Sequence, residues 1–113
     1  MVKIVLTLGE ADELCELTAA GHAEAGFFGS DPVCAAVSFL VRTVALYLDG
    51  ACSVKAENRG SFSLSVHSGS VSALRNDLRF LARLVKVGVE SLTAEYPNNV
   101  ILEIKQKKDK ITF

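Results

Sequence analysis

Several common signatures are missing from this 113-residue chain, and each absence excludes a class of protein. There is no C-x-x-C and no H-E-x-x-H spacing, so the sequence predicts no metal site and no cofactor. No glycine-rich stretch ends in G-K-[ST], which excludes that type of phosphate-binding loop. No apolar run is long enough to span a bilayer, so we expect no membrane partner.

The chain also has little net charge and few cysteines. The net charge is -1, which gives the chain no overall attraction to nucleic acid or membrane, and half of the residues are apolar, which argues against disorder. The cysteines Cys15, Cys34 and Cys52 are odd in number and widely spaced, so they predict free thiols in a reducing compartment. The N-terminus meets an acidic residue too early for a signal peptide. We therefore expect a cytoplasmic protein with a single domain, residues 1–113.

The hydrophobic pattern predicts an α+β domain in the order ββαββαβ. Its sheet is expected to be largely antiparallel, with two helices packed on it. Asp31 reads as the N-cap of the first helix, Pro32 as its first residue, and Ser70 as the cap of the second helix. The expected strands are 2–8, 14–20, 54–58, 61–67 and 100–107, and the expected helices are 32–49 and 71–96.

Apolar residues lie on two opposite sides of the expected first helix. Phe39 and Leu46 occupy one side. The other side is a stripe that we expect to be buried, formed by Val33, Val37, Leu40, Val44 and Leu48. A helix that is apolar on both sides is covered twice, and a second subunit is a candidate for the outer cover.

The stretch GHAEAGFFGSDPVCAAVSFL, residues 21–40, holds the candidate catalytic side chains. Cys34 is expected in the first helical turn, where free backbone N–H groups and the helix dipole favour a thiolate. A cysteine nucleophile needs an acid or base, and the intervening loop can bring His22 over the helix start. Asp31 would cap the helix and could also orient the imidazole. From spacing alone, a packing role for Cys34 and a surface role for His22 stay open.

The loop between the histidine and the cysteine is rich in glycine. Gly21, Gly26 and Gly29 would let it open and close over a substrate. Phe27 and Phe28 are expected to line a pocket or to pack as a lid. The loop is therefore a candidate substrate-binding segment.

Four pieces of this stretch form a specific combination: GHA at 21–23, Gly29, Asp31 and VCAAVS at 33–38. They resemble the signature of the ribosomal-processing cysteine protease family, Prp, and the resemblance covers the full chain. It implies an α+β cysteine endopeptidase, usually a homodimer. Such an enzyme removes a short N-terminal extension from large-subunit ribosomal protein twenty-seven and so supports ribosome maturation. The family's nucleophile falls on Cys34 and its histidine on His22, and Asp31 matches its acidic position.

The mechanism that this implies is attack of a Cys34 thiolate on a peptide carbonyl, with His22 protonating the leaving amine. The N–H groups at the helix start would hold the oxyanion. The alternative is a non-catalytic, ribosome-associated binding or assembly module that keeps the cysteine for packing. A redox-sensing thiol lacks a resolving cysteine at close spacing.

The remaining candidates have simpler interpretations. Cys15 and Cys52 are expected to be structural, and His67 is expected at the surface or in a turn. A cluster of C-terminal lysines would keep an edge strand solvated, or would make a weak, salt-sensitive contact with RNA or ribosome-bound substrate. These residues are Lys105, Lys107, Lys108 and Lys110.

Overall fold

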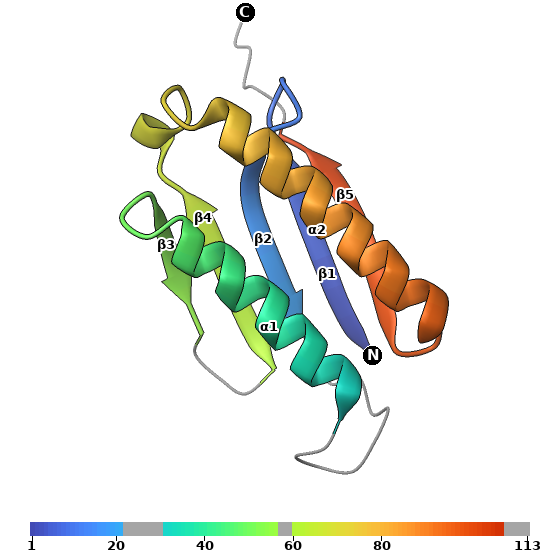
Figure 1. Ribbon diagram of the computed structural model, residues 1–113. Helices are drawn as coiled ribbons and strands as arrows, with labels where there is room; N and C mark the ends of the chain where they lie inside the picture. The colour runs from blue at the N-terminus through green and yellow to red at the C-terminus, as the bar shows by residue number, and fades with distance from the viewer. Residues whose placement is uncertain (22–30, 57–59, 108–113) are drawn as a thin grey trace, which may run out of the picture.

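The structure is a computed structural model, and it describes residues 1–21, 31–56 and 60–107. The strands are β1 (Val2–Leu8), β2 (Leu14–Ala20), β3 (Cys52–Lys55), β4 (Ser61–Val66) and β5 (Val100–Gln106). The helices are α1 (Pro32–Tyr47) and α2 (Arg75–Glu95), with a short 3₁₀ helix, η1 (Ser68–Ser70), before α2. Both long helices cover the same face of the sheet (Figure 1).

The described strands form one sheet in the order β3-β4-β2-β1-β5. Neighbouring strands are antiparallel except for β1 and β5, which are parallel. Strands β4 and β5 also run in the same direction, with β2 and β1 between them, and a connection between parallel strands needs a long crossover, which α2 provides. The predicted α+β class, the ββαββαβ order and the largely antiparallel sheet are confirmed. The predicted hairpin is also confirmed, although β3 begins at Cys52 rather than at Val54.

The hydrophobic core lies between the sheet and the two helices. Leu6, Leu17 and Leu64 stand side by side on β1, β2 and β4, and each is at most 1% exposed. Val33 of α1 and Val85 of α2 are fully buried on the helix side. Most of the predicted stripe on α1 is buried as expected, and Leu40 is half-buried. Removal of this apolar surface from water is the main force that holds the helices on the sheet.

The other face of the sheet has no helix over it among the described residues (Figure 1). Thr18 and Ser63 stand opposite each other there, and Lys3 Nζ lies 2.8 Å from Glu103 Oε2. Alternation of buried and polar residues is typical of a sheet with one solvated face. Any site formed with the helices must therefore lie on the helix side or at an edge.

Strand β5 lies at the edge of the sheet, as the cluster of lysines predicts. Lys105 and Lys107 are exposed, whereas Lys108 and Lys110 lie outside the described residues. Lys105 Nζ is 3.9 Å from a carboxylate oxygen of Glu103. Within the described ranges, no helix is both long enough and apolar enough to cross a membrane.

Helix α1 begins where the sequence predicts. Asp31 is its N-cap and Pro32 is its first residue. The helix ends at Tyr47, two residues before the expected end at Asp49, and Gly50 follows in the left-handed region with φ +81°. The early end does not move the helix start, which carries the candidate nucleophile.

The prediction of Ser70 as the cap of the second helix is wrong. Helix α2 begins at Arg75, and its N-cap is Leu74, which makes no side-chain capping bond. The Ser70 N–H instead donates to the carbonyl oxygen of His67 at 2.9 Å, which closes the 3₁₀ turn of η1. A serine ahead of an apolar repeat signals the end of a loop, but this local signal did not distinguish a 3₁₀ turn from the helix itself.

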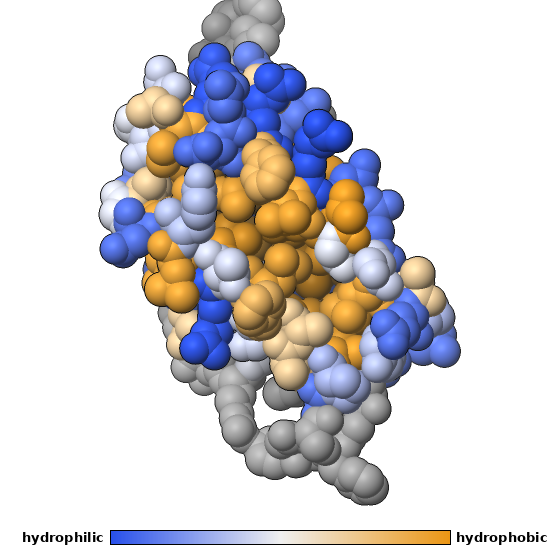
Figure 2. Space-filling view, viewed as in Figure 1, coloured by the Kyte–Doolittle hydropathy of each residue, from blue (hydrophilic) through white to orange (hydrophobic). Residues whose placement is uncertain are grey.

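The outer surface of the two helices carries large apolar side chains. Phe39 and Leu46 of α1 are 73% and 74% exposed, so they do lie opposite the buried stripe. Figure 2 shows apolar residues gathered over and between the helices. We call this surface the apolar helix face, and it comprises Phe39, Leu46, Tyr47, Phe80, Leu84 and Val87.

Candidate active site at the start of helix α1

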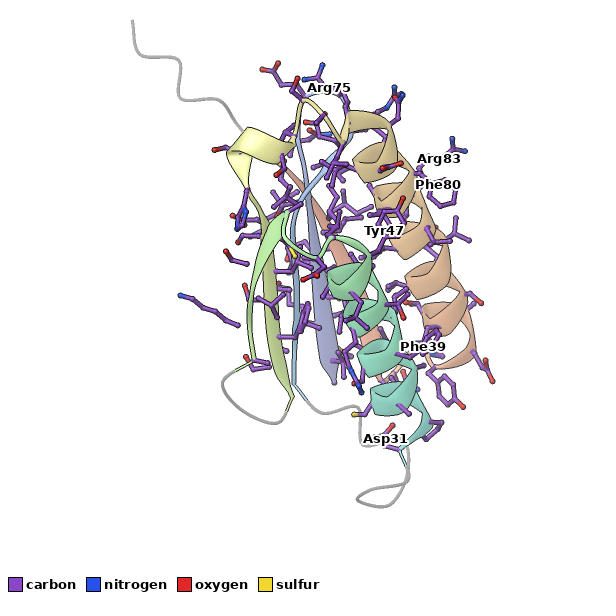
Figure 3. All side chains as sticks on the ribbon, turned by 60° about the vertical axis from the view of Figure 1, so that its left-hand side comes forward. Asp31, Phe39, Tyr47, Arg75, Phe80 and Arg83 are labelled. Atoms are coloured by element: carbon purple, nitrogen blue, oxygen red, sulfur yellow. The ribbon has the colours of Figure 1, made fainter. Side chains whose placement is uncertain are left out.

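The first turn of α1 is capped by the carboxylate of Asp31, which Figure 3 shows at the helix start. Asp31 Oδ1 accepts hydrogen bonds from the backbone N–H of Val33 at 2.9 Å and of Cys34 at 3.1 Å. The N–H of Ala35 donates to the Asp31 carbonyl oxygen at 3.1 Å. Pro32 has no N–H. Each N–H group of this turn therefore already has an acceptor.

This arrangement bears on the oxyanion donors that the sequence predicts. The first-turn N–H groups were the predicted oxyanion donors for a reaction at Cys34, yet the Asp31 carboxylate holds two of them. An oxyanion needs donors that are aimed at its own position. Either Asp31 rotates away during the reaction, or the donors come from elsewhere. The sequence predicts the cap correctly, but the cap occupies the donors that the proposed chemistry would use.

The Cys34 side chain lies at the margin of the core. It is half-buried and packs against the buried cluster, whereas its neighbour Val33 is fully buried. Cys34 therefore lies at the flank of the buried stripe of α1. One side of the thiol is thus held by packing, and the other side is accessible.

The chain approaches this site from the end of β2. Gly21 follows β2 with φ +105°, and its N–H donates to the Gly60 carbonyl oxygen at 2.8 Å. A Cβ atom at Gly21 would lie 2.2 Å from the Met1 carbonyl oxygen, so only glycine fits. The end of β2 and the start of α1 lie at the same end of the molecule (Figure 1). The predicted site residues between them lie outside the described residues: His22, Gly26, Phe27, Phe28 and Gly29.

The strand register places His67 at the opposite end of the sheet. Ala20 pairs with Ser61, near the start of α1, and β4 runs away from there toward His67. Six residues of strand span roughly 20 Å. The His67 ring is exposed, and its Nε2 lies 2.8 Å from Ser53 Oγ, so the predicted surface role is confirmed. His67, one of the two histidines of the chain, is therefore too far from the start of α1 to act on Cys34.

The environments of Cys15 and Cys52 disfavour their thiolates. Burial raises the pKa of the Cys15 thiol, and the nearby Glu13 carboxylate raises it further. Burial also raises the pKa of the Cys52 thiol, with a smaller contribution from Asp49. Both thiols are free, and both are half-buried. These properties are those expected of structural cysteines.

A shallow groove of about 610 Å³ lies between α2 and β5, away from the start of α1. It is lined by Lys86, Glu90, Thr93, Ala94, Ile101, Leu102 and Ile104. Its lining contains neither cysteine nor histidine, so it offers no thiol nucleophile. Among the residues described, no group of three or more His, Cys, Asp or Glu side chains is arranged to hold a metal ion.

The family model for cysteine protease Prp matches residues 1–101, which includes the whole GHA…VCAAVS stretch. The chain belongs to this family. It is therefore a cysteine protease, and the family resemblance read from the sequence is confirmed.

Solved structures of Prp share the fold of the chain. The essential ribosomal processing protease Prp from S. aureus, with a covalently linked product peptide, is 22% identical, with a TM-score of 0.76 over 93% of this chain and 100% of that chain. Its complex with a substrate peptide has a TM-score of 0.74 at 18% identity, with the same coverage of both chains. SMU.848 from Streptococcus mutans is 25% identical, with a TM-score of 0.70 over 95% and 96% of the two chains. The comparison with curated proteins gives no match.

Proposed function

We propose that this Prp family member removes a short N-terminal extension from large-subunit ribosomal protein twenty-seven in the cytoplasm. Cys34 is the nucleophile and His22 is the general acid and base. The observation that carries the proposal is the position of Cys34, half-buried in the first turn of α1, at the end of the molecule where β2 leads into His22. One similar protein, solved in two peptide complexes, is a ribosomal processing protease, which supports a ribosomal peptide as substrate.

The reaction begins when the Cys34 sulfur attacks the carbonyl carbon of the scissile bond and forms a carbon–sulfur bond. The electron pair of the carbonyl double bond moves to oxygen. When this pair returns, the carbon–nitrogen bond breaks, and the His22 imidazolium gives its proton to the departing amine. Water then attacks the thioester, His22 takes a proton from it, and Cys34 leaves as the thiolate.

Asp31 determines where the oxyanion can be held in this scheme. While its carboxylate accepts from Val33 and Cys34, the tetrahedral oxygen needs other donors. If the carboxylate rotates toward His22, it frees both N–H groups and orients the imidazole at the same time. The Asp31 side chain would then cap the helix in one rotamer and orient the imidazole in another.

Intact-mass spectrometry of full-length ribosomal protein twenty-seven from the same organism tests the proposal. Wild-type protein should release one defined N-terminal fragment. Cys34→Ala and His22→Ala should release none, whereas the matched controls Cys15→Ala/Cys52→Ala and His67→Ala should cleave normally. Cleavage by Cys34→Ala would show that Cys34 is not the nucleophile. Loss of cleavage in His67→Ala but not in His22→Ala would show that His67, and not His22, is the catalytic histidine.

Thiol alkylation separates a nucleophile from a cysteine kept for packing. At mildly acidic pH, Cys34 should react much faster than Cys15 and Cys52, because burial raises the pKa of both of those thiols. Tryptic mass spectrometry after a short iodoacetamide pulse gives the three rates in one sample. Equal, slow alkylation of all three would favour the non-catalytic binding module.

We also propose that the protein is a homodimer whose two subunits contact each other through the apolar helix face. Four of its side chains, Phe39, Leu46, Phe80 and Val87, are each at least 65% exposed. A standard interface takes roughly 800 Å² from each partner, and it is built around large apolar side chains of this kind. Figure 2 shows that this surface is continuous across both helices. A two-fold axis would bury it against the same surface of a second copy.

Light scattering coupled to gel filtration tests the dimer. Wild-type protein should have twice the mass of the chain. Phe39→Asp/Leu46→Asp should be monomeric, whereas Asn98→Asp adds a charge in an exposed turn and should stay dimeric. A monomeric wild type at micromolar concentration, or a dimer that survives both substitutions on α1, would contradict the proposed interface.

A further inference from the structure

A row of four exposed cations runs along one side of α2. Arg75, Arg79 and Arg83 are spaced by four residues, and Lys86 follows three residues later. Residues four apart lie on the same side of a helix, with a rise of about 6 Å between them, so the row extends over roughly 16 Å. We call this row the basic ridge.

The ridge lies on the flank of α2 that faces away from α1. Lys86 lines the groove between α2 and β5. Gly88 faces the other way, since a Cβ atom there would lie 3.8 Å from the Leu40 side chain of α1. Figure 3 shows Arg75 at the beginning of α2 and Arg83 further along, beside Phe80. The ridge therefore borders the apolar helix face at Arg83 and reaches the groove beside β5 at Lys86.

The charges of the ridge are not compensated within the part of the chain that the structure describes. The ion pairs there join Glu103 to Lys3 and Lys105, and no ridge residue takes part in one. The ridge continues only as far as Lys86, because Glu90 stands one turn later.

The row also opposes the stability of its own helix. Like charges one turn apart repel, and Arg79 has one on each side. Cations near a helix N-terminus are disfavoured by the helix dipole, and Arg75 is the first residue of α2. A chain with a net charge of -1 thus keeps three arginines where they disfavour α2. A partner of opposite charge explains this better than solubility does.

We propose that the basic ridge binds the phosphate backbone of RNA. A regular row of cations suits a repeating polyanion more than it suits a single carboxylate, and planar guanidinium groups match phosphate oxygens in pairs. The proposal rests on the proposed function in one respect only, the place where the protein would encounter RNA, since a protease for a ribosomal protein works beside RNA. The binding itself rests on the ridge, and it would hold the enzyme near its substrate without taking part in the chemistry.

Fluorescence anisotropy with a labelled single-stranded oligouridylate tests the ridge on the Cys34→Ala protein, so the result does not depend on protease activity. Four phosphate contacts to a single strand give a salt slope of about -2.8, which is a loss of roughly 50-fold in affinity between 50 and 200 mM salt. Arg79→Gln/Arg83→Gln should halve the slope to about -1.4. The matched control, Arg42→Gln/Lys55→Gln, removes the same charge elsewhere and should leave the slope unchanged.

One further variant, two further measurements and one competitor sharpen the result. Arg79→Lys/Arg83→Lys should keep most of the salt slope, because the charges remain. In a protein that keeps Cys34, Arg79→Gln/Arg83→Gln should melt no lower than wild type, since it relieves repulsion, and should cleave a free peptide at the wild-type rate. RNA binding that is absent at 50 mM salt, or lost equally in the control, overturns the proposal. Equal binding of a polyglutamate peptide of the same charge would assign the ridge to an acidic protein instead.

Discussion

Replacing Asp31 by alanine removes the acceptor of two N–H groups in the first turn of α1. These bonds are 2.9 and 3.1 Å long, and both belong to residues that the core holds, the fully buried Val33 and the half-buried Cys34. Loss of an N-cap costs about 0.5 to 2 kcal/mol, and two well-formed bonds at a packed helix start place this site in the upper half of that range. For a chain of this length, the melting temperature should fall by roughly 4 to 10 °C.

Asp31→Asn is the control that separates the cap from the charge. Asparagine caps helices about as well as aspartate, so its free energy of unfolding should stay close to that of wild type. If Asp31 also orients His22 through its charge, Asp31→Asn should cleave the ribosomal substrate slowly although it is stable. If Asp31 only caps the helix, Asp31→Asn should cleave normally.

Thermal and urea denaturation of the three proteins, beside the cleavage assay, give both answers. Wild-type stability in Asp31→Ala would refute the capping argument, because the loss of the acceptor for two N–H groups must lower the free energy of unfolding if the bonds form in solution. Faster cleavage by Asp31→Ala than by wild type would indicate that the carboxylate blocks the oxyanion donors of the first turn.

Three other substitutions have outcomes that follow from the structure. Gly21→Ala should destabilise the fold by more than about 1 kcal/mol in urea titrations, because φ is +105° and the new Cβ would meet the Met1 carbonyl oxygen. Leu64→Ala should cost about 2 to 5 kcal/mol, because its side chain is fully buried between sheet and helices, and a loss below 1 kcal/mol would contradict that packing. In wild type, the hydrogen bond and charge of Lys3 lower the pKa of Glu103. The pair therefore stabilises the folded protein at a pH above the ordinary glutamate pKa, and this stabilisation is lost as the pH falls through the lowered pKa of Glu103. Lys3→Ala should therefore raise the pKa of Glu103 in an NMR titration, and an unchanged pKa would show that the pair does not form in solution.

Much of the active-site region could be predicted from the sequence because its signals are local. Asp31 and Pro32 specify a helix start within three residues, and the position of Cys34 on the helix follows by counting. Other features could not be predicted locally. The carboxylate that caps α1 also occupies the N–H groups beside Cys34, which depends on a side-chain rotation that no residue pattern encodes.

The burial of a charged residue, Glu13, could not be predicted from the sequence either. Glu13 is only 6% exposed, and its Oε2 accepts from the Ala11 N–H at 3.2 Å in the turn between β1 and β2. A Cβ atom at Gly9 would overlap the Glu13 carboxylate, so the glycine makes room for it. An acidic residue beside a turn predicts solvent exposure by default, and only the packed turn shows otherwise.

The sequence by itself determined the type and order of the elements, the start of α1 and the free state of the thiols, because periodicity, capping and composition act over a few residues. The tertiary structure decided the rest. It made β5 the parallel neighbour of β1, moved His67 to the opposite end from the start of α1, and joined apolar residues of two helices into one exposed face. Each of these features depends on which distant segments pair and in which register. That choice is made by the burial of the whole core rather than by any local stretch of the chain.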